Sequence, residues 1–288
     1  MEMIFRRIRK QNMNDDPDKK LSVIIGAYNC ASTLPETLDS IISQTFSGFI
    51  CYVCDDGSSD NTADVIKMYT KKDSRIVFLQ NEKNSGLSYT LNKMIRLCNT
   101  PFIARMDGDD IAESERFEKQ IAFMQNNDEI ALCGCSVQYF DDNGIWGKQI
   151  YPEHPDRNSF LFVSPFVHPS IMFRTSALLE MKDPVTGFFY SEDKAIGRSE
   201  DYDLFMRMYA KGFKGYNFQD TLLRYREDRN AHKKRKFKYT FAEARVRFRG
   251  FKKLHLLPKG FVYVIKPIII GLIPARIWFN FRKRYFGI

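Results

Sequence analysis

Two acidic clusters in the first half of the sequence follow short apolar runs. Asp107 and Asp109 come directly after Phe102–Met106, and carboxylates at this spacing can bind one hard cation or divide between a cation and a ribose. Mg²⁺ and Mn²⁺ prefer such oxygen ligands and keep positions open for phosphates. The alternative is an acidic turn in which Asp110 caps the next helix. The position at the end of a predicted strand favours the cation site.

The second cluster is Asp55 and Asp56, which follow the apolar run Phe49–Cys54. Adjacent carboxylates can accept hydrogen bonds from the ring N–H of a nucleobase and from a ribose hydroxyl. The alternative is a polar turn that caps a helix starting at Thr62. Residues 58–61 could supply that cap alone, so the two interpretations are compatible.

Three further groups lie in the second half of the chain. Asp201, beside Glu200, stands at the start of a predicted helix and could act as a general base if burial raises its pKa. A capping role is the alternative, and the sequence by itself favours it. His168 precedes the apolar run Ile171–Phe173 and could bind an acceptor hydroxyl or a phosphate. A lone histidine there is more often a structural hydrogen-bonding group.

The elements that must position these groups alternate between strand and helix patterns. Strands are predicted at 21–27, 49–54, 75–80 and 102–106, and helices at 32–44, 62–71 and 87–98. This order predicts an α/β fold with a parallel sheet, in which ligands bind beyond the carboxyl ends of the strands. Tyr28–Asn29, Asp55–Asp56 and the Asp107/Asp109 pair should therefore meet at one crevice. Later in the chain, helices are predicted at 114–126, 200–211 and 240–257, and strands at 130–140, 145–151 and 168–174.

Composition excludes several classes of protein. The chain has 288 residues, of which 44% are hydrophobic and 27% charged, so it is neither disordered nor fibrous. Six cysteines are too few for a disulfide scaffold, and they are predicted to be reduced core thiols. The sequence contains neither a GxGxxG nor a GxxxxGK[ST] loop, which argues against dinucleotide oxidoreductases and P-loop NTPases.

The net charge of +9 is unevenly distributed along the chain. Residues 221–288 hold 19 basic and 3 acidic residues, whereas residues 1–220 hold 25 basic and 32 acidic ones. The basic end also carries apolar runs at 261–265, 268–273 and 277–281, with Tyr263, Trp278 and Tyr285 suited to a headgroup layer. We expect it to bind an anionic membrane surface and no nucleic acid. Packing on the body or on another subunit is the structural alternative.

Neither a secretory signal nor a membrane-spanning segment is evident, because the longest apolar stretch is far shorter than the roughly 20 residues that a bilayer requires. The expected location is the cytoplasm, at the inner face of the cell membrane.

Six segments, taken in order, resemble the motifs of the family 2 glycosyltransferases. They are LSVIIGAYN, CDDGSSDNT, ARMDGDD, FVHPSIMFRTSAL, SEDYDLFMRMYAKGF and RYRED, and they run through most of residues 21–226. The resemblance implies the GT-A fold, a Rossmann-like, mostly parallel sheet flanked by helices, here with a basic amphipathic helical extension. It divides the chain into a lead-in (1–20), a nucleotide-sugar half (21–115), an acceptor and catalytic half (116–226) and the basic region (227–288).

The resemblance also implies roles on the donor side. Ala27, Tyr28 and one or both of Asp55 and Asp56 would hold the base and ribose of a nucleotide-sugar. Asp107 and Asp109 would bind the diphosphate through Mn²⁺ or Mg²⁺; in the alternative, one of the two binds the ribose.

On the acceptor side, the resemblance makes Asp201 the catalytic base of an inverting transfer, with Glu200 beside it and His168 nearby. A hexosyl or N-acetylhexosaminyl group would pass from a UDP-sugar to a glycan or lipid-linked glycan of a bacterial surface polysaccharide. The alternatives are a nucleotidyltransferase on a similar fold, which has no use for Asp201, and a non-catalytic membrane-binding or RNA-binding member.

The chain departs from the family pattern at Gly26, where many members have Pro, and at Leu91, where many have Arg. The second departure weakens a donor role for the loop at 86–92. Arg105 could contact the diphosphate, but a strand-end ion pair is the favoured interpretation.

Overall fold

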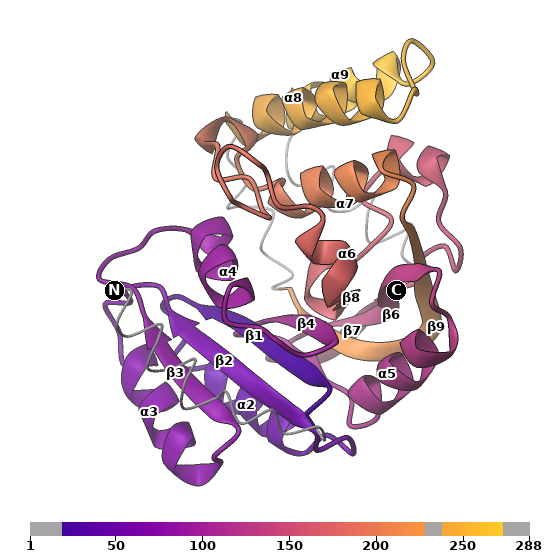
Figure 1. Ribbon diagram of the computed structural model, residues 1–288. Coiled ribbons are helices and arrows are strands. Elements are labelled where there is room, and N and C mark those ends of the chain that lie inside the picture. The colour runs from indigo at the N-terminus through magenta and orange to yellow at the C-terminus, as the bar shows by residue number, and fades with distance from the viewer. Residues whose placement is uncertain (1–18, 228–237, 273–288) are drawn as a thin grey trace.

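A single mixed sheet organises the computed structural model, which describes residues 19–227 and 238–272 (Figure 1). The strand order is β3-β2-β1-β4-β8-β6-β9-β5, with β7 paired to β6. The strands are β1 (Leu21–Ala27), β2 (Phe49–Asp55), β3 (Ile76–Gln80), β4 (Phe102–Asp107), β5 (Ile111–Ala112), β6 (Ile130–Asp141), β7 (Gly144–Gln149), β8 (Met172–Arg174) and β9 (Lys214–Arg226).

Helices cover both faces of this sheet, and the last two helices form a further layer beyond them (Figure 1). They are α2 (Leu34–Ile42), α3 (Thr62–Lys72), α4 (Leu87–Ile95), α5 (Arg116–Asn126), α6 (Thr175–Leu179), α7 (Glu200–Ala210), α8 (Lys238–Lys253) and α9 (Phe261–Leu272), with short 3₁₀ turns η1 (Arg157–Leu161), η2 (His168–Ser170) and η3 (Lys194–Ile196). The predicted strand–helix order of the first half is confirmed. The GT-A-like α/β fold is therefore confirmed as well.

Side chains alternate between the two faces of each strand, and this alternation gives one hydrophobic cluster on each side of the sheet. In β1, Ile24 packs into a cluster with residues of α4 and α7, while Val23 and Ile25 pack with residues of α2 and α3 on the other face. Cys54 and Cys51 likewise belong to clusters on opposite faces. All six cysteines are free thiols; four of them are buried in the core as predicted, whereas Cys30 and Cys98 are only partly buried.

One predicted strand and one strand that was not predicted separate the sequence analysis from the structure here. The segment 168–174 is not one strand, because η2 occupies its first three residues; Pro169 fixes a helical φ and lacks the N–H that a strand ladder would use. Strand β9 was not predicted. It pairs parallel with β6 through several register shifts, and these shifts break the period-two pattern by which a strand is recognised.

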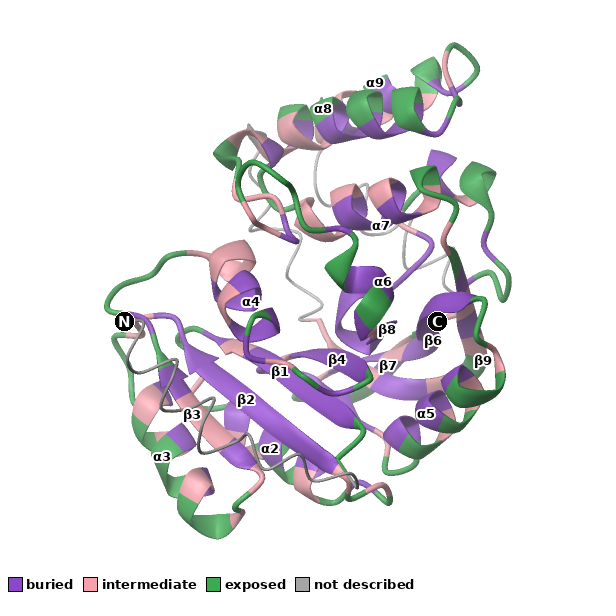
Figure 2. Cartoon of the chain, in the orientation of Figure 1, coloured by how far each residue is buried: buried purple, intermediate pink, exposed green. Residues whose placement is uncertain are grey.

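Helices α8 and α9 form a separate layer above α7 (Figures 1 and 2). Gly250 lets α8 approach α7 closely, since a Cβ there would lie 2.2 Å from the Met206 sulfur. Within the described residues, no helix is long and apolar enough to cross a membrane. The predicted lead-in up to residue 18, the segment 228–237 and residues 273–288, with Trp278 and Tyr285, lie outside the described residues.

Candidate active site

Three neighbouring parallel strands bring the predicted polar clusters to one edge of the sheet. In the β1–β2 ladder Ala27 lies opposite Asp55, and in the β1–β4 ladder Gly26 lies opposite Asp107. The Asp56 N–H donates to the Ala27 carbonyl at 2.8 Å. The clusters therefore lie at one edge of the sheet, as predicted, although only Asp107 and Asp109 among them line the cavity described below.

Asp55 and Asp56 are both buried, and each braces a loop at this edge. Asp55 accepts hydrogen bonds from the Ser58 N–H at 3.1 Å and from Gln80 Nε2 at 3.0 Å. Asp56 accepts from Asn81 Nδ2 at 2.7 Å and from the N–H groups of Ser85 and Gly86 at 2.9 and 2.8 Å. The two carboxylates thus fix the shape of the loops at this edge.

Neither carboxylate caps α3. The N-cap residue is Asn61, whose side chain makes no capping hydrogen bond, and Asp60 Oδ1 in the preceding turn accepts from the Thr62 N–H at 3.0 Å. Tyr28, at the same edge, is half-exposed, whereas Ala27 is buried.

The acidic turn after β4 has the composition of a site for a hard cation. Asp107, Asp109 and Asp110 each offer an oxygen, and these oxygens lie within 4.8 Å of one another. Asp110 is buried, and its Oδ2 has no hydrogen-bond partner among the described residues, while its Oδ1 accepts from the Arg226 N–H at 2.8 Å. An orphaned buried oxygen beside two other carboxylates fits a divalent metal. Asp110 does not cap α5, whose N-cap residue is Glu115.

Burial and mutual repulsion raise pKa values in this cluster. The pKa of Asp109 rises to about 6, first through burial and then through the Asp107 charge. The pKa of Asp110 rises well above its ordinary value for the same reasons. Any added positive charge would favour the ionised forms of both.

Two arginines supply positive charge next to this cluster. Arg105 makes a two-pronged contact with Asp107, with Nη1 2.8 Å from Oδ2, so the predicted strand-end ion pair is confirmed. Arg226 of β9 donates from Nε to the Asp109 carbonyl at 3.0 Å and pairs with Glu36 and Asp142.

A second acidic pair stands at the first turn of α7. The Asp201 Oδ1 accepts from the N–H of its neighbour Tyr202 at 2.7 Å. Burial is the main cause that raises the pKa of Glu200 to about 7 and that of Asp201 to about 6. The Arg105 charge opposes both shifts. No ion pair of either carboxylate is seen among the described residues, so this pair is placed to exchange protons near neutral pH.

One cavity of about 760 Å³ joins the two acidic groups. The predicted site residues that line it are Asp107, Asp109, His168, Glu200 and Asp201. Ala27, Tyr28, Asp55 and Asp56 are not among its lining residues and lie at the adjoining strand edge. A molecule in this cavity would therefore contact both the β4 turn and the start of α7.

His168 lines the cavity but has a partner inside the protein. Its Nε2 lies 2.8 Å from the Tyr190 hydroxyl, and burial lowers the pKa of His168 well below its ordinary value. The ring is therefore neutral near pH 7, and the structural alternative for this histidine is observed alongside its place on the cavity wall.

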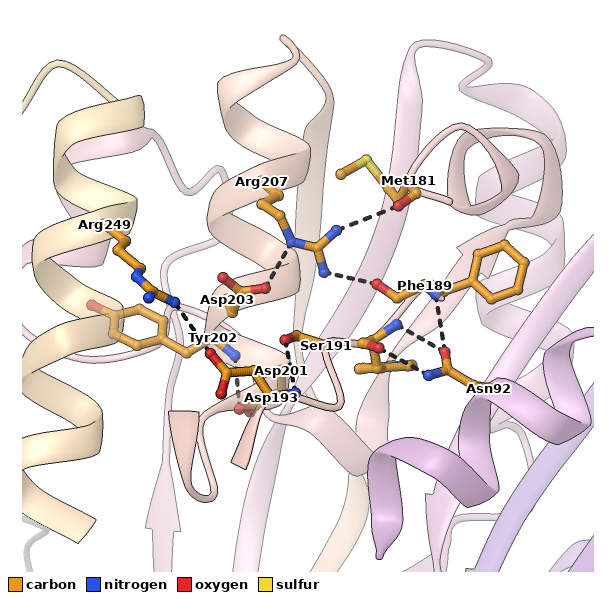
Figure 3. Close-up of polar contacts among 11 residues, drawn as sticks. Asn92, Met181, Phe189, Ser191, Asp193, Asp201, Tyr202, Asp203, Arg207 and Arg249 are labelled. Carbon is orange, nitrogen blue, oxygen red and sulfur yellow. Dashed lines mark hydrogen bonds and ion pairs between the residues drawn. The ribbon is translucent and has the colours of Figure 1, made fainter. Parts of the chain in front are cut away.

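Figure 3 shows a polar network that the sequence did not reveal. Asn92 of α4 accepts from the N–H groups of Phe189 and Tyr190 at 3.0 and 2.9 Å and donates to the Tyr190 carbonyl at 2.8 Å. Arg207 of α7 donates to the Phe189 carbonyl at 2.7 Å and pairs with Asp203. This network joins α4 to the helix that carries Asp201. The only sequence signal was Asn92 itself, directly after the departure from the family pattern at Leu91.

Comparison with known proteins agrees with this architecture. The sequence profile described as "Glycosyl transferase family 2" matches residues 22–182. EpsE of Bacillus subtilis, a protein assigned by name to the glycosyltransferases, is 36% identical over 273 residues and covers 94% of this chain and 95% of its own.

Two further proteins extend the comparison. The Escherichia coli UDP-Gal:alpha-D-GlcNAc-diphosphoundecaprenol beta-1,3-galactosyltransferase is 27% identical, over 91% of this chain and 94% of its own. The structure of S. aureus TarS 1-349 in complex with UDP-GlcNAc superposes with a TM-score of 0.66 at 20% identity, over 86% of this chain and 73% of that one, which shows a shared fold. The chain belongs to glycosyltransferase family 2.

Proposed function

We propose that this protein is a metal-dependent, inverting glycosyltransferase that moves a hexosyl or N-acetylhexosaminyl group from a UDP-sugar to an acceptor hydroxyl. The observation that carries the proposal is the cavity that places the acidic turn of β4 and the acidic start of α7 around one space. Inverting transfer needs an incoming hydroxyl and a departing diphosphate on opposite sides of one sugar carbon, and two separate acidic groups meet that need.

The donor half would bind the nucleotide. Ala27, Tyr28, Asp55 and Asp56 would contact the base and ribose from the edge formed by β1 and β2. UDP is favoured because the S. aureus relative by fold is described with UDP-GlcNAc and the E. coli relative is named for UDP-Gal.

Asp107 and Asp109 would hold Mn²⁺ or Mg²⁺ next to the diphosphate, and the orphaned oxygen of Asp110 supports a cation there. When bound, such an ion neutralises the charge that develops on the leaving diphosphate. The chain itself contributes the fixed turn after β4, which keeps the carboxylates close together without a rearrangement of the backbone.

Asp201 would take the proton of the acceptor hydroxyl as the new C–O bond forms. Its raised pKa, about 6, is suited to a base that works near neutral pH. Glu200, with a pKa of about 7, would remain partly protonated beside it and so limit the repulsion between them. His168 would contribute to the acceptor side as a neutral hydrogen-bonding group.

The acceptor is proposed to be a glycan or lipid-linked glycan of a bacterial surface polysaccharide. The support is the E. coli relative, whose name specifies a sugar on diphosphoundecaprenol. A nucleotidyltransferase would not require the acidic pair at α7. A non-catalytic member would not need to keep both acidic groups on one cavity, so these alternatives are less well supported.

Membrane binding is part of the proposal, and helix α9 supports it. Its solvent-exposed side consists of apolar residues at helical spacing, which we name the α9 stripe: Phe261, Val262, Ile265, Ile269 and Leu272. An exposed helix face is normally polar, so a continuous apolar stripe indicates a partner surface. Phe162 and Val163, both more than half-exposed, extend it, because Phe162 packs against Tyr263 and its carbonyl accepts from Lys266 Nζ at 2.7 Å.

Charge decides between a bilayer and a second copy of the chain as the partner. The segment 238–272 has eight basic residues and one acidic residue. Two such surfaces face to face would repel, whereas each Lys or Arg close to an anionic leaflet contributes about 1 kcal/mol. We therefore propose that the protein lies on the inner face of the cell membrane, in the cytoplasm, with the α9 stripe in the interface.

Vesicle sedimentation tests this surface. The double variant Ile265→Asp/Ile269→Asp should lose binding to vesicles that contain anionic lipid, since it places two carboxylates in the stripe. Val185→Asp is a matched control on an exposed valine far from α9 in sequence, and it should bind as the wild type does. Equal sedimentation of the double variant would contradict the proposal, and a concentration-dependent dimer lost only in that variant would favour a second copy instead.

Calorimetric titration with UDP, GDP, CDP and dTDP, each with and without Mn²⁺, tests the catalytic proposal. We expect UDP to bind and to bind much more tightly with the metal. Binding of a different nucleotide would correct the donor, and the absence of binding by all four would contradict the assignment.

A further inference from the structure

Arg105 is a buried cation on the cavity wall, and its only ion-pair partner among the described residues is a proposed metal ligand. Its side chain is 2% exposed, and it grips both oxygens of Asp107. Its Nε has no hydrogen-bond partner among the described residues. A buried guanidinium that has one unused donor and a single anionic partner is stable only while that anion neutralises its charge.

The backbone around Arg105 is fixed, so only its side chain can respond to a ligand. The Arg105 N–H donates to the Ile171 carbonyl at 2.9 Å, and its own carbonyl accepts from Arg116 Nη2 at 3.1 Å. Arg116 is itself buried against Gln120 of α5. The strand therefore cannot carry Arg105 away when Asp107 changes partner.

Arg105 and the metal proposed above would therefore compete for the Asp107 carboxylate. A divalent cation bound to Asp107 would place two positive charges, the ion and the buried Arg105 guanidinium, on one carboxylate. That arrangement is unfavourable until an anion joins the two cations. The other cavity arginines already have partners: Arg226 pairs with Glu36 and Asp142 and donates to the Asp109 carbonyl, and Arg198 lies over the Tyr239 ring.

We propose that Arg105 neutralises Asp107 in the metal-free protein and turns to the donor diphosphate when the metal takes Asp107. This inference rests on the proposed function. Its consequence is that metal and nucleotide bind as a unit: the protein binds Mn²⁺ weakly alone, and the nucleoside diphosphate makes the complex favourable by supplying the anion that Arg105 has lost. Arg105 is then a diphosphate-binding residue that also makes metal binding conditional on the donor.

The test measures Mn²⁺ affinity by the spin-resonance signal of the free ion, with and without UDP. For the wild type we expect UDP to raise Mn²⁺ affinity by a factor on the order of a hundred, within the usual range of coupling between sites. Arg105→Gln should bind Mn²⁺ alone several-fold more tightly, because the competing cation is gone. It should also lose about tenfold or more of the coupling.

Two variants serve as controls. Arg105→Lys keeps the charge but not the fork, so its coupling should fall between the wild type and the glutamine variant, even if Arg105→Gln proves too unstable to measure. Arg75→Gln removes an arginine that pairs with Asp73, also two residues away in the sequence, at the opposite end of the sheet. This variant should change neither the Mn²⁺ affinity nor its coupling to UDP.

The outcomes separate the two proposals. Wild-type coupling in both Arg105 variants would overturn the role of Arg105 while leaving the enzyme assignment intact. Weaker Mn²⁺ binding by Arg105→Gln in the absence of UDP would also overturn it. If the wild type shows no Mn²⁺-dependent UDP binding at all, the proposed function fails first.

Discussion

Both acidic walls of the cavity consist of carboxylates, but they differ in whether arginines contact them directly. The turn after β4 carries Asp107, Asp109 and Asp110 with the positive ends of Arg105 and Arg226 against it. At the start of α7, Glu200 and Asp201 lie on the same cavity without an ion pair among the described residues. The pKa values of carboxylates on both walls are raised, so the contrast lies in the contacts. Three carboxylates gathered around one point suit a divalent cation, whereas a pair without a cationic partner suits proton exchange. On this basis we propose that the first wall serves the diphosphate and the second the acceptor.

Replacing Asp201 tests this contrast with the largest expected effect. Asp201→Asn removes the proton acceptor but keeps the shape, so transfer should fall by about 10²–10⁴-fold, the usual contribution of a general base. The affinity for UDP with Mn²⁺ should stay at the wild-type level, because the donor wall is untouched. Both are measured on one preparation, by product formation and by calorimetry.

A transfer rate near that of the wild type in Asp201→Asn would reduce Asp201 to a structural residue. The stability of the variant shows whether a loss of transfer comes merely from unfolding. Burial raises the pKa of the Asp201 carboxyl in the folded state, so its contribution to stability is present at low pH and is lost as pH rises through about 6. The neutral asparagine should therefore leave the protein at least as stable as the wild type above pH 7.

The pH dependence of transfer gives a smaller, graded effect. A base works only when it is deprotonated, and the pKa values of Asp201 and Glu200 are raised to about 6 and about 7. We expect kcat/KM to be level above pH 7 to 8 and to fall about tenfold for each pH unit below about 6. A profile that stays flat down to pH 5 would show that no group with a raised pKa takes part.

The first half of the fold was predictable because local patterns and long-range structure agree there. Apolar runs such as Leu21–Ala27 end in turn residues, and parallel pairing then brings the ends of β1, β2 and β4 together. The positions of Asp107 and Asp109 followed from this register. The same reasoning placed Asp55 and Asp56 at the edge, but it could not show that their oxygens brace neighbouring loops.

The rest depended on contacts between residues distant in the sequence. Strand β9 is bulged against β6, so its alternation was invisible, and with it the approach of Arg226 to Asp109. Asn92 meets Tyr190 across 98 positions, which no local pattern encodes. The helix predicted at 240–257 ends at Lys253, and the α9 stripe became visible only when the structure showed which side of α9 is exposed.

The most direct test of the two-wall account is a calorimetric titration of UDP, with and without Mn²⁺, into the wild type, Asp109→Asn and Asp201→Asn. We predict that Mn²⁺ strengthens UDP binding in the wild type and in Asp201→Asn. In Asp109→Asn we predict the same weak affinity whether or not the metal is present, because the cation site has lost a ligand. Full Mn²⁺ dependence in Asp109→Asn would contradict the assignment of the β4 turn, and with it the division of the cavity into a cation-holding wall and a proton-accepting wall.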